Sequence, residues 1–484
     1  MPEVVKFIYL WQIIRRMTSN IIGRKAEISS LNRVATSGRS EFVAIYGRRR
    51  VGKTYLVREF FDNNFSFKCT GLANSKTRAQ LKNFNLALRR FAGKEIKQAR
   101  TWLDSFEQLS DILDKSATKR KVVFLDELPW MDTARAGFIQ ALEHFWNEWA
   151  SARRDIVLVV CGSSTSWMMD KLINNKGGLH NRLTNKILLK PFTLSECEQY
   201  FKSRKIVLSR YQIAEYYMIM GGIPYYLDYI EKGVPINQNI DKLFFDEGGQ
   251  MRNEFDNLYS ALFKNTELYL NVVRAINKKG QGLTRKELTT TLKIKSGSAL
   301  TKVLKDLEKC GFIRSYLDFK SKTRNKVYQL TDPYTLFYYK FIDSQEYTDK
   351  HFWSNSLNTP ERNTWAGLSF EILCLNHSDQ ILNALGISGV RTNITSWRGE
   401  SAQIDMVIDR KDDCINLCEM KFSRKEFTID KQYSEKLENK IESFIEETST
   451  SKAILLTLIT SKGLKINTYS DIAQCQVTLD DLFN

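Results

Sequence analysis

Residues 42–54 read FVAIYGRRRVGKT, an apolar run followed by a loop that contains two glycines and closes on Lys-Thr. The apolar run predicts a buried strand, and residues 55–61 predict a helix. Glycines let successive backbone N–H groups curl around phosphate oxygens, and the helix adds its positive N-terminal end. The stretch has the G-x-x-x-x-G-K-[ST] pattern in the strand–loop–helix setting that a nucleoside triphosphate site requires.

Two side chains of this loop have a defined chemical role. The Lys53 ammonium can reach the β- and γ-phosphates, and the Thr54 hydroxyl can hold Mg²⁺. ATP and Mg²⁺ are therefore the expected cofactors. The expected nucleotide-binding residues of the loop are Gly47, Arg48, Arg49, Arg50, Val51, Gly52, Lys53 and Thr54.

A second apolar run, residues 121–127 (KVVFLDE), ends in two carboxylates about 70 residues after the loop. Asp126 is expected to hold Mg²⁺ through water, and Glu127 to orient and activate the attacking water as the catalytic residue. An apolar strand that ends in Asp-Glu is common by itself and usually runs into a solvated loop. Paired with the phosphate loop, it predicts the catalytic edge of an NTPase sheet.

A third predicted strand, residues 156–161, ends in Gly162-Ser163-Ser164. Two interpretations of the serines are open. Ser163 can be a polar group near the γ-phosphate, or one of the two serines can cap the helix that starts near Thr165.

Composition indicates the broad class of protein. A chain of 484 residues exceeds what one hydrophobic core usually serves, so about three domains are expected. A hydrophobic fraction of 43% with 26% charged residues indicates a soluble globular protein. The eight cysteines are scattered along the chain, which favours thiols in the core over disulfides or a metal site. A chain without disulfides is expected in the reducing cytoplasm. The apolar run at residues 7–14 is too short to span a membrane, and residues 1–20 are interpreted as an N-terminal extension.

The positive charge of the chain is localised. The net charge is +17 overall, residues 265–345 carry 16 basic and 7 acidic side chains, and residues 360–484 carry 14 basic and 19 acidic ones. A localised basic field predicts a polyanionic partner, with DNA as the first candidate.

Strand and helix patterns divide the chain further. Residues 21–192 predict a P-loop core with a doubly wound parallel sheet, and residues 193–260 predict an α-helical lid. The lid contains Gly221-Gly222-Ile223-Pro224. This turn either lies near the nucleotide base or is a plain helix–helix turn.

Residues 261–345 predict a winged helix. Thr284 to Glu287 form a capping box, and Leu300, Val303, Leu304 and Leu307 follow helical spacing on a second helix. Residues 312–319 and 326–330 predict a hairpin with a basic tip at residues 320–326. The layout fits a recognition helix in the DNA major groove with the tip on phosphates, although such domains also serve protein–protein contacts.

Residues 346–364 are interpreted as a linker, and residues 365–484 as a last α/β domain. Within it Glu371 lies on an apolar helix, while Asp405 and Glu419-Met420-Lys421 lie on predicted strands. A strand period of two puts Glu419 and Lys421 on one face. Glu371, Asp405 and Glu419 are therefore candidate catalytic and Mg²⁺-binding groups, with Lys421 as a catalytic cation, whereas a salt-bridged sheet edge is the alternative.

The last domain resembles the PD-(D/E)xK, or restriction-endonuclease-like, fold over roughly residues 365–460. One departure is Gln403-Ile404, which stands where proline is common before the metal-binding Asp. The resemblance implies Mg²⁺-dependent cleavage of phosphodiesters.

The whole chain resembles a family with an archaeal-type ATPase domain of the AAA+/STAND class, a winged helix and a C-terminal nuclease-like domain known as DUF234. Ile22-Gly23-Arg24, the phosphate loop, Leu125-Asp126-Glu127, residues 162–166, residues 221–224 and the C-terminal Asp and Glu-Met-Lys carry this resemblance. It implies that Pro224 contacts the nucleotide. It also implies that Arg182 points towards the γ-phosphate, on its own subunit or on a neighbour.

The function predicted from these features is an ATP-hydrolysing switch that couples nucleotide state to DNA binding and to Mg²⁺-dependent DNA cleavage. The alternative is a regulatory switch that binds DNA or protein without cutting, with an inactive nuclease-like domain. A homo-oligomeric motor is the third interpretation.

Overall fold

The structure is a computed structural model that describes residues 20–263, 266–280, 282–317, 319, 326–343, 349–400 and 402–484. The chain divides into two compact units, one that ends at Pro191 and one that runs from Phe192 to Asn484. The predicted N-terminal extension lies outside the described residues except for Asn20, and the predicted basic hairpin tip lies outside them except for Lys326. In the described part of the chain, no helix has the length and apolar character needed to cross a membrane.

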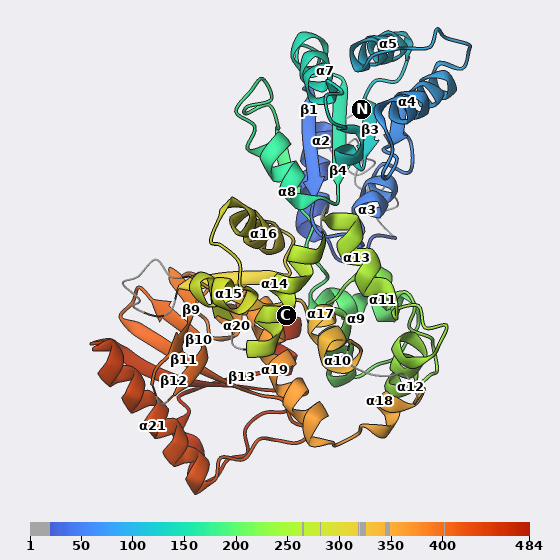
Figure 1. Cartoon of the computed structure of the whole chain (residues 1–484). Coiled ribbons are helices and arrows are strands. Elements are labelled where there is room, and N and C mark those ends of the chain that lie inside the picture. The colour runs from blue at the N-terminus through green and yellow to red at the C-terminus, as the bar shows by residue number, and fades with distance from the viewer. Residues whose placement is uncertain are drawn as a thin grey trace, which may run out of the picture. The chain divides into compact units, whose positions relative to one another are not determined.

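A parallel five-stranded sheet forms the centre of the first unit (Figure 1), which confirms the predicted α/β class. The strand order is β2-β3-β4-β1-β5, so the strand before the phosphate loop pairs with β4 and β5. The carboxyl ends of parallel strands meet at one edge of a sheet, which is where ligands bind in open α/β sheets. The strands are β1 (Glu41–Tyr46), β2 (Phe67–Thr70), β3 (Lys121–Asp126), β4 (Ile156–Gly162) and β5 (Asn185–Leu188).

Both faces of this sheet are buried, which explains its nearly continuous apolar strands. Phe42 and Ala44 of β1 share a core cluster with aromatic side chains of α4 and α5. Val43 and Ile45, which point to the opposite face, are also fully buried. The helices of this unit are α2 (Lys25–Thr36), α3 (Lys53–Phe60), α4 (Thr77–Ala92), α5 (Trp102–Lys115), α6 (Leu128–Met131), α7 (Phe138–His144) with its π-helical continuation η1 (Phe145–Ala150), and α8 (Thr165–Trp167) with η2 (Met168–Ile173).

The second unit begins with a helical region. Thr193 and Ser209 each form a capping box with the residue three positions later, and these boxes start its first two long helices. The helices are α9 (Leu194–Ser203), α10 (Arg210–Met220), α11 (Pro224–Leu227), α12 (Ile236–Ile240) with η3 (Asp241–Phe245), and α13 (Glu254–Leu262).

A helical segment with a small sheet follows. It contains α14 (Thr266–Lys279), β6 (Leu283–Thr284), α15 (Arg285–Leu292), α16 (Ser298–Lys309), β7 (Ile313–Leu317) and β8 (Lys326–Leu330). The strands pair antiparallel in the order β6-β8-β7. The predicted capping box at the start of α15 is confirmed, because Thr284 and Glu287 exchange both hydrogen bonds. The four predicted apolar positions of α16 are all buried.

The segment predicted as a linker contains ordered helix. After α17 (Pro333–Phe341), the chain forms α18 (Phe352–Asn355), and α19 (Pro360–Asn376) begins five residues before the predicted start of the last domain. Aromatic packing orders this segment, since the buried Trp353 ring lies 5.2 Å from Phe341 and 5.4 Å from Trp365. The helix α18 has four residues, which is too few for a helical pattern to be recognised in the sequence.

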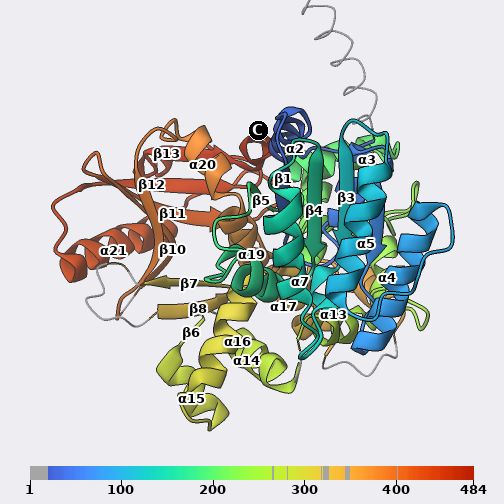
Figure 2. The same cartoon turned by 90° about the horizontal axis from the view of Figure 1, so that it is seen from above.

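A mixed five-stranded sheet forms the C-terminal part of the second unit (Figure 2). Its order is β13-β12-β11-β10-β9, with β9 to β11 antiparallel and β11 to β13 parallel. The elements are α20 (Ser378–Ala384), β9 (Thr392–Arg398), β10 (Gln403–Arg410), β11 (Cys414–Lys421), α21 (Lys431–Thr448), β12 (Ala453–Thr460), η4 (Ser470–Ile472), β13 (Cys475–Thr478) and η5 (Leu479–Phe483). The sequence did not predict β13, which has four residues.

Candidate nucleotide site and carboxylate pocket

The backbone of the phosphate loop adopts positive φ angles at its two glycines, Gly47 and Gly52. Gly47 has a φ of 141°, and a Cβ atom there would lie 2.2 Å from the Leu189 carbonyl oxygen. Gly52 has a φ of 92° and forms the N-cap of α3. Arg50 also has a positive φ, of 71°. These left-handed turns let the loop curl in front of the N-terminus of α3.

The Lys53 side chain lies over this loop. Its buried Nζ donates hydrogen bonds to the carbonyl oxygens of Gly47, at 3.0 Å, and Arg48, at 2.8 Å. The ammonium is thereby held at the concave side of the loop, where phosphate oxygens would replace the carbonyls as its partners.

Thr54 and Asp126 form a contact between the phosphate loop and the end of β3. The Thr54 hydroxyl donates to Asp126 Oδ2 at 2.9 Å, and Asp126 is 5% exposed. Burial, and after it the neighbouring Glu127 charge, raise the pKa of Asp126. A hydroxyl and a buried carboxylate are the ligands that Mg²⁺ takes beside triphosphates, and a cation would relieve the buried charge. The residues present therefore fit a Mg²⁺ site.

Glu127 is held by the end of the neighbouring strand β4. Ser163 donates to Glu127 Oε2 twice, from its backbone N at 3.1 Å and from its hydroxyl at 2.8 Å. Ser164 is the N-cap residue of α8, as one of the two interpretations expected, but its side chain makes no capping hydrogen bond there. Gly162 has no room for a side chain, because a Cβ atom would lie 2.7 Å from Met168 Sδ and 2.8 Å from Pro129 Cδ.

Arg24 is a residue of this site that the sequence reasoning did not assign. It is 5% exposed, adopts a φ of 54°, and donates from Nη2 to the Val51 carbonyl of the phosphate loop at 3.2 Å. Gly23-Arg24 is part of the motif that carries the family resemblance, but the sequence analysis assigned no role to Arg24. Arg24 supports the outer side of the loop.

Two further residues are predicted to contact the nucleotide, and the structure gives the local setting of each. Arg182 is exposed in the turn before β5, where its backbone N donates to the Leu179 carbonyl at 3.1 Å. Pro224 begins α11 in the second unit. In the adjoining turn a Cβ atom on Gly222 would lie 2.3 Å from the Phe192 carbonyl oxygen, so the double glycine there has a packing role.

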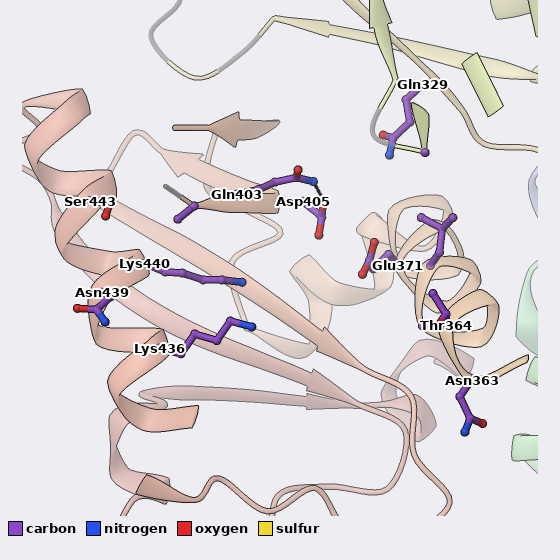
Figure 3. Close-up of a pocket in the computed structure, with 14 residues that line it drawn as sticks. Gln329, Asn363, Thr364, Glu371, Gln403, Asp405, Lys436, Asn439, Lys440 and Ser443 are labelled. Atoms are coloured by element: carbon purple, nitrogen blue, oxygen red, sulfur yellow. Dashed lines mark hydrogen bonds between the residues drawn. The ribbon is translucent and has the colours of Figure 1, made fainter. Parts of the chain in front are cut away.

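Two of the three predicted C-terminal carboxylates, Glu371 and Asp405, line a pocket of about 960 Å³ in the second unit (Figure 3). Figure 3 shows Glu371 on α19 and Asp405 on β10 facing this space, with Lys440 reaching towards it from α21. The lining residues are Gly280, Gln329, Asn363, Thr364, Gly367, Leu368, Glu371, Ala402, Gln403, Asp405, Lys436, Asn439, Lys440 and Ser443.

Glu371 and Asp405 form a pair of carboxyl groups with raised pKa values. Burial, then the charges of Asp405 and Glu419, raise the pKa of Glu371 to about 8. Burial is also the main cause that raises the pKa of Asp405, although the side-chain amide of Gln403 donates a hydrogen bond to it. A carboxyl pair of this kind repels itself when ionised, which is the electrostatic condition a divalent cation relieves.

The negative charge of Glu419 is balanced by two neighbouring ammonium groups. Lys421 lies 2.9 Å from Oε1, Lys440 lies 2.9 Å from Oε2, and the Tyr433 hydroxyl donates to Oε1 at 2.5 Å. Burial acts against ionisation, but the two ammonium groups outweigh it and lower the pKa of Glu419 to about 2. The shared face of Glu419 and Lys421 is as predicted.

The sequence reasoning missed Lys440 and Tyr433. The two residues are seven positions apart on α21, so they lie on one face of the helix. That spacing could have indicated from the sequence that the two side chains act together.

Among the described residues, no three His, Cys, Asp or Glu side chains are grouped so as to hold a metal ion. Glu371 and Asp405 are the two carboxyl groups that this pocket would offer to a cation.

Comparisons with known proteins identify the first part of the chain. Residues 21–230 match the family described as an ATPase domain predominantly from Archaea. An uncharacterized protein of Methanocaldococcus jannaschii is 26% identical over 323 residues, which cover 66% of this chain and 68% of that protein. An uncharacterized ATP-binding protein of the same organism is 40% identical over 42 residues, which cover 9% of this chain and 71% of that protein.

Two solved structures are similar to the chain. A Walker-type ATPase of Pyrococcus abyssi has a TM-score of 0.46 at 18% identity and covers 66% of this chain and 95% of its own. The Aeropyrum pernix ORC2 protein, in complexes with ADPNP and ADP, has a TM-score of 0.34 at 16% identity and covers 65% and 93%. The family match over residues 21–230 agrees with the phosphate loop, and both support an ATPase domain of the archaeal P-loop type in this part of the chain.

Proposed function

We propose that the chain is an ATP-hydrolysing switch in which Lys53, Thr54, Asp126 and Glu127 do the chemistry. The observation that carries this proposal is the pair of hydrogen bonds from Ser163 to Glu127, beside the Thr54–Asp126 contact. The two bonds fix the carboxylate at the sheet edge where the phosphate loop also lies. A catalytic base needs such positioning before its basicity matters.

Each residue then has one task in hydrolysis. Lys53 exchanges its carbonyl partners for phosphate oxygens, and Thr54 with Asp126 would hold Mg²⁺. When bound, Mg²⁺ supplies positive charge that the transferred phosphoryl group requires. Glu127 orients the attacking water and accepts its proton, while Ser163 keeps the carboxylate in place.

Phosphate release from ATP tests the ATPase proposal. Glu127→Gln should retain ATP binding and lower the turnover rate about 100-fold or more, because it removes the base and keeps the shape. Glu107→Gln, an exposed position on α5, is the matched control. A Glu127→Gln protein that hydrolyses ATP at the wild-type rate would exclude Glu127 as the base.

We further propose that residues 261–345 are a winged helix that binds DNA. The support is the localised positive charge together with exposed lysines on α16, at positions 302 and 305. Nucleotide state in the ATPase domain would bias this DNA contact through the helical region, residues 193–260. A homo-oligomeric form belongs to the same proposal, and an ATPase rate per subunit that rises with protein concentration would reveal it.

For the C-terminal pocket we propose Mg²⁺-dependent phosphodiester cleavage. The support is the half-buried carboxyl pair Glu371 and Asp405 next to three ammonium groups on Lys421, Lys436 and Lys440. The carboxylates would hold the metal with the scissile phosphate. Lys421 would then stabilise the charge that develops at that phosphate.

Cleavage of plasmid and linear DNA with Mg²⁺ or Mn²⁺ tests this assignment. Asp405→Asn should abolish cleavage. Asp409→Asn is the control on the same strand, because Asp409 pairs with Lys452 rather than lining the pocket. Equal cleavage by wild type and Asp405→Asn would show that a different site or a contaminant cuts the DNA.

The ion pairs of Glu419 favour a second candidate function. Both carboxylate oxygens are occupied by Lys421 and Lys440, as in a structural salt bridge. In that case the C-terminal region is a docking platform, and the protein is a regulatory switch that binds DNA or protein without cutting it. Wild type that binds DNA but is as inert as Lys421→Ala would support this function.

A further inference from the structure

The β7–β8 hairpin contacts the C-terminal sheet directly (Figure 2). The backbone N of Phe319 donates to the Ser396 carbonyl at 3.0 Å, and the Thr395 hydroxyl donates to the Leu317 carbonyl. The Phe319 ring lies 5.0 Å from Phe444 in the apolar cluster beneath β9 to β11. The hairpin is therefore joined to the sheet by polar and apolar contacts together.

A chain of hydrogen bonds runs from this hairpin to Asp405. Arg314 on β7 donates from Nε to Gln329 Oε1 at 2.8 Å and from Nη2 to the Ser396 hydroxyl at 2.9 Å. The Ser396 hydroxyl in turn donates to the Asp405 carbonyl at 2.6 Å. Gln329 and Asp405 both line the carboxylate pocket. The guanidinium therefore links two pocket residues that lie on different sheets.

The charge of Arg314 also interacts with the carboxylate pocket, through Asp405. No carboxylate of the described residues forms an ion pair with it, and Asp405 is the carboxylate whose charge acts on it. Desolvation lowers the pKa of Arg314 to about 10, so its burial has an energetic cost. A desolvated cation without an ion pair is expensive in a simple structural contact. Next to a pair of carboxyl groups, the same cation offsets negative charge.

We infer that Arg314 is a positioning residue of the carboxylate pocket. It fixes the backbone at Asp405 through Ser396 and orients Gln329, which lines the pocket from β8. Residues 365–484 alone therefore contain an incomplete site, and strands β7 and β8 complete it through Arg314 and Gln329. The inference rests on the metal-dependent function proposed for this pocket.

Arginine is suited to this task, because its planar fork can serve two partners at fixed angles. Lysine at the same position would keep the charge and lose one of the two bonds. Arg285 provides a matched control within the same region. It donates to Ser296, to the Gly297 carbonyl and to Thr301, all within its own helical segment.

Titration of the full chain with Mn²⁺ in the absence of nucleotide tests the inference, with the electron paramagnetic resonance signal of free Mn²⁺ as readout. Asp405→Asn identifies the binding that belongs to the pocket. Arg314→Gln should weaken that binding about 10-fold or more, as loss of an outer partner of metal ligands usually does. Arg314→Lys should weaken it less, and Arg285→Gln should leave it unchanged.

Hydrogen exchange of residues 403–410 gives a readout that needs no metal. Arg314→Gln and Ser396→Ala should each speed exchange in this strand, and the double variant should add little, since both break one chain of bonds. Unchanged Mn²⁺ affinity and unchanged exchange in folded Arg314→Gln would overturn the inference. Faster exchange in a chain whose wild type shows no Asp405-dependent Mn²⁺ binding would instead reject the proposed cleavage and retain the positioning role.

Discussion

The nucleotide site and the carboxylate pocket use similar groups but assemble them differently. Each combines carboxylates with a lysine. In the nucleotide site these groups come from two short stretches of sequence, residues 47–54 and 121–127, with support from Ser163 at the end of β4. In the pocket they come from α19, β10, β11 and α21, and Arg314 of β7 hydrogen-bonds Gln329 and Ser396 next to it.

This difference determines what a single substitution should do. A residue of the phosphate loop acts on the ligand directly, so its loss should appear first in binding or turnover. A residue of the pocket holds other side chains across elements, so its loss should also appear in stability and in pH dependence. The following substitutions test that contrast, beginning with the largest expected effect.

Lys53→Ala should lower ATP affinity about 100-fold or more. The ammonium makes two hydrogen bonds inside the loop, and each charge-assisted bond to phosphate contributes about 1.5–3 kcal/mol. Titration with a fluorescent ATP analogue measures this change. Lys82→Ala, an exposed lysine on α4, should bind as wild type does. ATP affinity that survives Lys53→Ala would remove the phosphate loop from the account.

Ser163→Ala should lower the ATP turnover rate by about 10-fold and leave ATP affinity nearly unchanged. The variant removes the hydroxyl that donates to Glu127 at 2.8 Å but keeps the backbone donor at 3.1 Å. Steady-state phosphate release gives the turnover rate and KM separately. A large rise in KM alone would assign Ser163 to nucleotide binding rather than to positioning Glu127.

The pocket should make stability depend on pH in two directions. Glu371 has a folded-state pKa of about 8, above its unfolded value, so its contribution is present at low pH and is lost as pH rises towards 8. Glu419 has a folded-state pKa of about 2, so its contribution is present above the unfolded value and is lost as pH falls towards 2. Glu371→Gln should therefore reduce the loss of stability between about pH 5 and 8 by roughly 1–3 kcal/mol.

Denaturant unfolding of metal-free protein at several pH values measures that change. Glu446→Gln, an exposed position on α21, should follow the wild-type pH profile. A Glu371→Gln profile identical to wild type would show that the pKa of Glu371 is not raised in the folded chain.

Lys302→Ala and Lys305→Ala on α16 should have the smallest effects, a loss of DNA affinity of a few-fold each. If both lysines contact phosphates, each change should reduce the slope of log affinity against log salt by about 1, equally for all DNA sequences. Fluorescence anisotropy at several salt concentrations gives this slope. Lys340→Ala, whose side chain pairs with Glu361, is the control. Unchanged slopes would favour a protein-binding role for this region.

The contrast also explains what the sequence could predict. The phosphate loop and the strand that ends in Asp126-Glu127 could be predicted, because in each of them adjacent residues determine both the local structure and the functional groups. The capping box at Thr284 and the apolar face of α16 were readable for the same reason, since both are local. The fold class followed from these elements.

The pocket was readable only in part. Glu419 and Lys421 share a strand, so their common face followed from the strand period. Arg314 comes next to the site through tertiary packing, which no local pattern reveals, whereas the only sequence signal for Lys440 was its spacing from Tyr433 on α21. The helix α18 escaped prediction because aromatic contacts order it, and β13 escaped because it is four residues long.

The central claim is that nucleotide state controls DNA binding, and one measurement tests it most directly. The affinity of the full chain for a labelled DNA duplex would be measured without nucleotide, with ADP and with a non-hydrolysable ATP analogue, for wild type and Lys53→Ala. The account predicts an affinity that differs about 5-fold or more between nucleotide states in wild type and not at all in Lys53→Ala. Equal DNA affinity of wild type in all three states would contradict it.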